Sequence, residues 1–124
     1  MKPTGVFVYG TLLAGASHGG MLAGFPRYAA RVRGHLFDLP EGYPAMVLAE
    51  GEDWTYGELV EGVPDRIVEL VDTYEGVEQG LFQRVPVEAW LGLRPVAAWS
   101  WVMDGARRRG VRVPSGRWRR SRRR

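Results

Sequence analysis

The chain has 124 residues and a formal net charge of +3, and it is long enough for one domain to bury a core without disulfide or metal support. It contains no cysteine, which excludes disulfides, thiolate nucleophiles and cysteine-ligated zinc, and neither His18 nor His35 has a second ligand at metal-binding spacing, so we expect no metal site and no cofactor. The charge is unevenly divided, because residues 107–124 contain ten arginines and no acid, which leaves seven basic and fourteen acidic residues in 1–106.

The first predicted strand covers residues 5–9 and runs directly into Gly10 and Thr11. Its apolar character predicts burial on both faces. A glycine there allows a turn and a close approach of a ligand to the main chain, whose N–H groups can hold a carboxylate or an oxyanion. An ordinary turn is the alternative. The segment is shorter than the roughly 20 residues of a membrane span and has no signal-peptide pattern, so we expect a cytoplasmic protein without membrane contact.

Residues 14–24 are rich in glycine and alanine and predict a loop with at most a short helical turn, in which His18 faces solvent. Alternating polarity and strand-forming residues then predict three strands, over 31–39, 43–49 and 54–60. The second and third are expected to form a hairpin. His35 falls in the polar phase of the first and is assigned a structural role.

A helix is predicted to begin at Pro64 and Asp65 and to end at Gly76, because the apolar residues between them recur at helical spacing. Two further strands follow over 82–90 and 95–102, and residues 111–118 close the ordered part. One helix that interrupts a series of strands predicts an α+β fold with a curled, largely antiparallel sheet.

Glu75 occupies the last turn of this helix, where the partial negative charge of the helix end disfavours a carboxylate. Shelter by Tyr74 and the sheet would raise the pKa of the Glu75 carboxyl further, toward the range in which it can exchange a proton near neutral pH. The sequence therefore marks Glu75 as a candidate general acid and base. An exposed helix-end glutamate without a role is the alternative.

The arginine-rich end is predicted to be a disordered tail over 119–124, after a domain over 1–118, because runs of like charge repel one another. Such a tail can make weak, non-specific contacts with nucleic acid. The rest of the chain shows no basic face interleaved with exposed aromatic residues, which argues against nucleic acid as the main partner. The oligomeric state is left open.

Several short motifs occur in the order that is typical of the gamma-glutamylcyclotransferase-like (AIG2-like) family, which the chain resembles over residues 5–118. They are Tyr9-Gly10-Thr11-Leu12, Tyr43-Pro44-Ala45, Tyr56-Gly57-Glu58-Leu59, Asp72-Thr73-Tyr74-Glu75-Gly76 and Val113-Pro114-Ser115-Gly116-Arg117-Trp118.

The resemblance implies a small mixed β-barrel with helices packed outside and a cavity at its mouth. It also implies an enzyme that cyclises a gamma-glutamyl amine or gamma-glutamyl amino acid to 5-oxoproline and releases the amine, with no metal and no cofactor. Matched to the family motifs by position, the resemblance implies that Glu75 transfers the proton. It also implies that the substrate is bound by Tyr9, Gly10, Thr11, Leu12 and Tyr43.

Two features depart from the family pattern. Many relatives carry a tyrosine where this chain has Phe82, two residues before Arg84, so one substrate-orienting hydroxyl is missing; Arg84 itself is expected to pair with an acid. The arginine tail is also foreign to the pattern. A non-catalytic pocket protein for a small acid and an RNA-associated protein of the same fold remain as alternatives.

Overall fold

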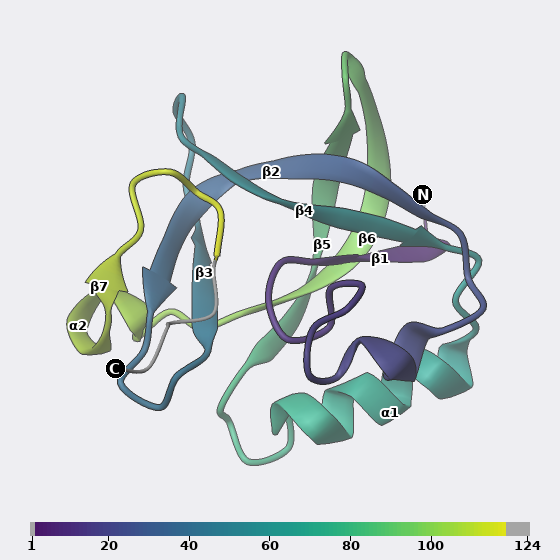
Figure 1. Ribbon diagram of the computed structural model, residues 1–124, viewed down its shortest axis with the longest axis horizontal. Helices are drawn as coiled ribbons and strands as arrows, with labels where there is room; N and C mark the ends of the chain where they lie inside the picture. Colours follow the sequence, from purple (N-terminus) through teal and green to yellow (C-terminus); the bar gives the residue numbers. More distant parts are fainter. Residues whose placement is uncertain (1, 119–124) are drawn as a thin grey trace.

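Five strands close a mixed β-barrel in the computed structural model, which describes residues 2–118 (Figure 1). The barrel order is β2, β4, β1, β6, β5 and back to β2; β1 and β6 are parallel, and the other neighbours are antiparallel. The helices lie outside, so the predicted α+β class and barrel are confirmed. The strands are β1 (Gly5–Val8), β2 (Arg27–Asp38), β3 (Pro44–Leu48), β4 (Trp54–Glu61), β5 (Gln83–Leu91), β6 (Arg94–Val102) and β7 (Val111–Arg112).

The hairpin predicted between the strands at 43–49 and 54–60 is wrong. Strand β3 pairs with the second half of β2, from Gly34 to Asp38, and β4 pairs with its first half, from Arg27 to Arg33. Both lie antiparallel to β2 and follow one another along it. The long strand β2 arches over the molecule, and β3 and β4 pair with successive parts of it (Figure 1). The residues between β3 and β4 therefore connect two strands that both pair with β2, and they do not form a hairpin turn.

The predicted helix is confirmed as α1 (Asp65–Glu75), with Pro64 at its N-cap and Gly76 in the left-handed conformation after its end. The predicted loop contains one 3₁₀ turn, η1 (Gly19–Leu22), which lies beside α1 (Figure 1). Sequence reasoning missed the short helix α2 (Ala106–Arg109). In the closing segment only Val111–Arg112 forms a strand, paired with β2.

Two apolar clusters meet at β1, whose four residues are all buried as predicted. Phe7 belongs to the cluster that fills the barrel, together with Leu59 and Met46. Val6 and Val8 belong to the cluster between the barrel and α1. Because successive side chains of a strand point to opposite faces, β1 joins both cores and holds the turn that follows it in a fixed place.

The tail predicted over 119–124 lies outside the described residues. Within residues 2–118, none of the helices combines the length and the apolar character that a membrane span requires.

Replacing Gly57 with alanine should destabilise the barrel. A Cβ atom on Gly57 would lie 2.0 Å from the carbonyl oxygen of Val8, so β4 and β1 would have to separate. We expect a loss of about 1–3 kcal/mol in the free energy of unfolding, the usual cost of overpacking. Gly20→Ala is the matched control, because no atom lies within 4 Å of its added Cβ. Urea denaturation of both variants measures the difference, and equal stabilities would contradict it.

Candidate active site

A cavity of about 230 Å³ lies between the turn after β1, the end of α1 and the segment that leads into β5. Its wall includes all the residues that the sequence selected: Tyr9, Gly10, Thr11, Leu12, Tyr43 and Glu75. Phe7, Leu81, Phe82 and Trp101 add apolar surface. The turn at residues 9–12 and Glu75 are far apart in the sequence but lie at one site. They meet because β1 runs through the barrel wall against which α1 packs.

The turn after β1 lines this cavity and contains unpaired main-chain donors. Within residues 2–118, the backbone N–H groups of Gly10, Thr11 and Leu12 have no hydrogen-bond acceptor. Consecutive free N–H groups form a concavity that favours an anion or a developing oxyanion.

Gly10 is required for packing rather than for an unusual backbone angle, since no positive φ is recorded for it. A Cβ atom there would lie 2.5 Å from Cγ of Pro44. The glycine motif and the Tyr43-Pro44-Ala45 motif are therefore in direct contact, which explains why both occur in one chain.

The hydroxyl of Tyr9 is fully used inside the protein. It donates to the carbonyl oxygen of Trp101 at 2.6 Å and accepts from the N–H of Met46 at 3.1 Å. Burial first, and then the negative charge of Glu75, raise the pKa of Tyr9. Tyr9 thus ties β3 and β6 to the turn and offers the cavity its ring rather than a free hydroxyl.

Burial in the cavity wall raises the pKa of the Glu75 carboxyl from 4.5 to about 7. Within residues 2–118, this carboxyl forms no ion pair or hydrogen bond that would stabilise its charged form. Its charge contributes to raised pKa values of Tyr43 and Tyr74, in which burial is the largest cause. The carboxyl and these hydroxyl groups therefore line one cavity, and the carboxyl can hold or release a proton near neutral pH.

Asp72 fixes the end of α1 against the barrel. Its carboxylate accepts from Nε of Arg84 at 2.9 and 3.1 Å and from Nε1 of Trp101 at 2.8 Å. Asp72 lies one helical turn before Glu75, on the same face of the helix, so this clamp also orients Glu75. The expectation that Arg84 pairs with an acid is confirmed.

A polar contact between the turn and α1 was missed by sequence reasoning. The hydroxyl oxygen of Tyr74 lies 2.9 Å from Oγ1 of Thr11 and 2.9 Å from Nδ1 of His18. The ring centroids of His18 and Tyr74 are 4.4 Å apart, with the rings tilted by 40°. His18 is exposed, as predicted, but it also holds the loop against the helix. A lone histidine in a glycine-rich loop gave no signal of this partner.

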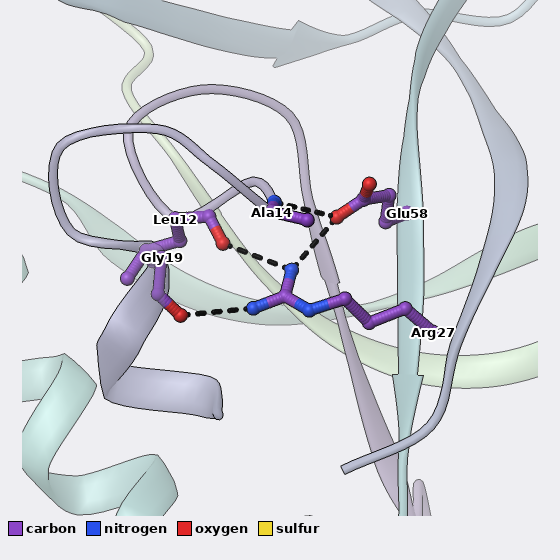
Figure 2. Close-up of polar contacts among 5 residues, drawn as sticks. All are labelled: Leu12, Ala14, Gly19, Arg27 and Glu58. Atoms are coloured by element: carbon purple, nitrogen blue, oxygen red, sulfur yellow. Dashed lines mark hydrogen bonds and ion pairs between the residues drawn. The ribbon is translucent and has the colours of Figure 1, made fainter. Parts of the chain in front are cut away.

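Arg27 holds the loop from the other side, as Figure 2 shows. Its guanidinium donates to the carbonyl oxygens of Leu12 and Gly19 at 3.1 and 2.9 Å, and to Oε1 of Glu58 at 2.7 Å. The same oxygen of Glu58 accepts from the N–H of Ala14 at 3.0 Å. This clasp replaces regular secondary structure in the loop, and nothing in the local sequence around Arg27 pointed to it.

Residues 2–118 contain no group of three or more histidine, aspartate or glutamate side chains arranged to hold a metal ion. The groups that line the cavity include main-chain N–H donors, a carboxyl with a raised pKa and aromatic hydroxyl groups.

Comparison with known proteins identifies the family of the chain and solved structures of the same fold. The sequence model of the family described as gamma-glutamyl cyclotransferase, AIG2-like, matches residues 6–120. YkqA from Bacillus subtilis is 24% identical with a TM-score of 0.76; the match covers 94% of this chain but only 40% of YkqA. The protein PH0828 from Pyrococcus horikoshii is 25% identical with a TM-score of 0.70, over 92% of this chain and 88% of that chain. An AIG2-like protein from Mus musculus is 22% identical with a TM-score of 0.68, over 83% and 78% of the two chains. No curated protein matches the sequence.

The raised pKa of Glu75 predicts a characteristic dependence of stability on pH. The protonated carboxyl favours the folded state below about pH 4.5, and this contribution is lost as the pH rises to about 7. Relative to Glu75→Gln, the natural protein should therefore lose about 2–3 kcal/mol of unfolding free energy between about pH 4.5 and 8. Urea denaturation across this range measures the difference. Glu69→Gln, on the exposed side of α1, should show no such trend; a pH-independent difference for Glu75→Gln would contradict the burial of its carboxyl.

Arg27→Lys should loosen the loop without unfolding the barrel. A single ammonium group cannot span two carbonyl oxygens and a carboxylate in the way that a guanidinium does. Amide hydrogen exchange should therefore become about tenfold faster at His18 and Leu13, whose N–H groups bond within the loop, and stay unchanged in β4 and β6. Arg31→Lys on the same strand is the control. Unchanged protection of the loop would show that the clasp does not hold it.

Proposed function

Because this chain belongs to the gamma-glutamyl cyclotransferase, AIG2-like family, we propose that it cyclises a gamma-glutamyl amine or gamma-glutamyl amino acid to 5-oxoproline. The observation that carries the proposal is the shared cavity, in which unpaired N–H donors of one turn and a carboxyl with a pKa of about 7 face the same space. A reaction of this kind needs an oxyanion site and one proton carrier, and it requires no protein nucleophile.

In the proposed complex, the turn from Tyr9 to Leu12 binds the gamma-glutamyl unit through its main chain. The N–H groups of Gly10, Thr11 and Leu12 are available as donors to a carboxylate or to the oxygen of the reacting carbonyl. The Tyr9 ring forms one wall, since its hydroxyl is already bonded. Phe82 stands where many relatives carry tyrosine, and its ring centroid lies 6.1 Å from that of Tyr43. We assign the polar contact on this side to the Tyr43 hydroxyl.

The proposed reaction forms one C–N bond and breaks another. The α-amine of the substrate attacks its own γ-carbonyl carbon, and the negative charge that develops on the carbonyl oxygen is stabilised by the N–H donors. Glu75 takes the proton that leaves the attacking nitrogen and delivers it to the nitrogen of the departing amine. The tetrahedral intermediate then collapses to the five-membered lactam. Holding the substrate in a folded conformation supplies much of the acceleration, because the attack is intramolecular.

Glu75→Gln should keep ligand binding and lose turnover. Glutamine preserves the shape of the side chain but cannot carry a proton, so the rate of 5-oxoproline formation should fall by at least roughly 100-fold. Formation of 5-oxoproline from a panel of gamma-glutamyl compounds, followed by mass spectrometry, measures the rate, and calorimetry with 5-oxoproline measures binding. In the natural protein, kcat/KM should rise with pH up to about 7, as the base form of Glu75 becomes populated.

Glu69→Gln serves as the control on the same helix, and it should act at the parent rate. A Glu75→Gln protein that forms 5-oxoproline as fast as its parent would refute the role of Glu75. If the natural protein binds 5-oxoproline but converts no member of the panel, the alternative of a non-catalytic pocket protein for small acids is favoured.

A further inference from the structure

Three arginines and two aromatic residues form a surface on the outside of the barrel, which we call the arginine–aromatic face. It consists of Arg31 and Arg33 of β2, Trp54 and Tyr56 of β4, and Arg117. The register of the two strands places Arg31 opposite Tyr56 and Arg33 opposite Trp54. Val32, which lies between the two arginines on β2, is buried in the barrel. The face is therefore built on a rigid sheet.

The guanidinium groups of this face lie over aromatic rings. The guanidinium carbon atoms of Arg31 and Arg33 are 3.9 and 4.3 Å from the ring centroid of Trp54, and that of Arg117 is 4.1 Å from the ring centroid of Tyr56. Stacking holds a guanidinium group in place and leaves N–H groups at the edge of its plane available. In Arg33 one of these donors is already used, because Nη1 donates to the carbonyl oxygen of Gly51. No local pattern predicts this face, because its residues come from three separate segments.

The three arginines have no carboxylate partner within residues 2–118. Two of the acidic groups nearby are paired elsewhere. Asp53 pairs with His35 and Arg112, and Glu58 pairs with Arg27. Glu50 and Glu88 line the same shallow groove as Arg33, and neither forms an ion pair with it. The three guanidinium groups are therefore not neutralised by direct ion pairs.

The segment around Arg117 runs beside the face. The carbonyl oxygen of Gly116 accepts from the N–H of Tyr56 at 2.8 Å, so residues 115–117 lie along β4. The indole Nε1 of Trp118 then donates to Oδ1 of Asp38 at 3.4 Å, at the end of β2. Five further arginines follow Trp118 in the sequence, and their contribution is tested separately from that of the face.

We propose that the arginine–aromatic face binds the phosphate backbone of a nucleic acid without reading its bases. Guanidinium groups fixed at the surface match phosphate oxygens in charge and geometry. The rings of Trp54 and Tyr56 are covered by guanidinium groups, so they offer no stacking platform for bases and no apolar group for insertion into a lipid bilayer. Contacts to phosphates alone position a nucleic acid but carry no sequence preference.

Fluorescence anisotropy with a labelled oligouridine of about 20 nucleotides tests the proposal, at NaCl concentrations from about 50 to 300 mM. Three double variants of the full chain each remove two positive charges. Arg31→Gln with Arg33→Gln changes the face, Arg122→Gln with Arg123→Gln changes the end of the chain, and Arg66→Gln with Arg108→Gln is the control. Arg66 and Arg108 are exposed on the helices and, within residues 2–118, lie in no ion pair.

The face variant should bind about tenfold more weakly at low salt, and its slope of log affinity against log salt should fall by about 1.4, because each phosphate contact with a single strand contributes roughly 0.7. The control should change affinity by less than about twofold, in keeping with a general charge effect. The sequence of the oligonucleotide should not matter. Melting temperature and 5-oxoproline formation serve as checks of folding, and Arg117→Gln, which lies outside the sheet, tests the same face if the double variant does not fold.

Equal affinities of the face variant and the control would overturn the proposal. It would also be overturned if the end variant alone abolished binding, since the face would then contribute nothing. Vesicles of phosphatidylglycerol provide the remaining test, because binding to them as tight as to the oligonucleotide would identify a membrane rather than a nucleic acid as the partner.

Discussion

The barrel depends on hydrogen bonding along a single strand, β2. Its first half pairs with β4, its second half pairs with β3 and β7, and Arg31 bridges to Trp90 of β5 to complete the circle. A strand of twelve residues is long enough to serve all these neighbours in turn, and its curvature brings the last strand back to the first (Figure 1). Closure places β1 inside the wall with both faces buried. The turn that follows β1 can then leave its N–H groups unpaired, because the strand before it already fixes its position.

Two carboxylates one helical turn apart experience opposite surroundings. Asp72 accepts hydrogen bonds from a guanidinium and an indole, which compensate for the water that it has lost. Glu75 faces apolar side chains, and burial raises its pKa to about 7. The fold tolerates the free-energy cost of burying Glu75 because the ion pair of Asp72 with Arg84 anchors the same stretch of helix. A fold can thus keep a reactive carboxyl in an unfavourable place when a well-bonded one beside it supplies the attachment.

Local patterns in the sequence predicted the features that depend on neighbouring residues. The buried strand before Gly10, the helix between Pro64 and Gly76 and most other strands follow from periodicity and from residues that end elements. The pairing of β3 was missed because two consecutive strands with a short connection favour a hairpin, whereas the choice of edge depends on β2. Similarly, the clasp at Arg27 and the contact between Tyr74 and His18 join residues 8 to 56 positions apart, and no local pattern encodes them.

The alternation of side chains along β2 also has an evolutionary consequence. Ala30 and Val32 face the interior, so substitutions there disturb the packing that supports the cavity, while Arg31 and Arg33, which alternate with them, face outward. Selection can therefore act on the two sets almost independently, although they alternate in one segment. Descendants of such a protein can gain, lose or exchange surface partners through single substitutions while their internal chemistry is inherited unchanged.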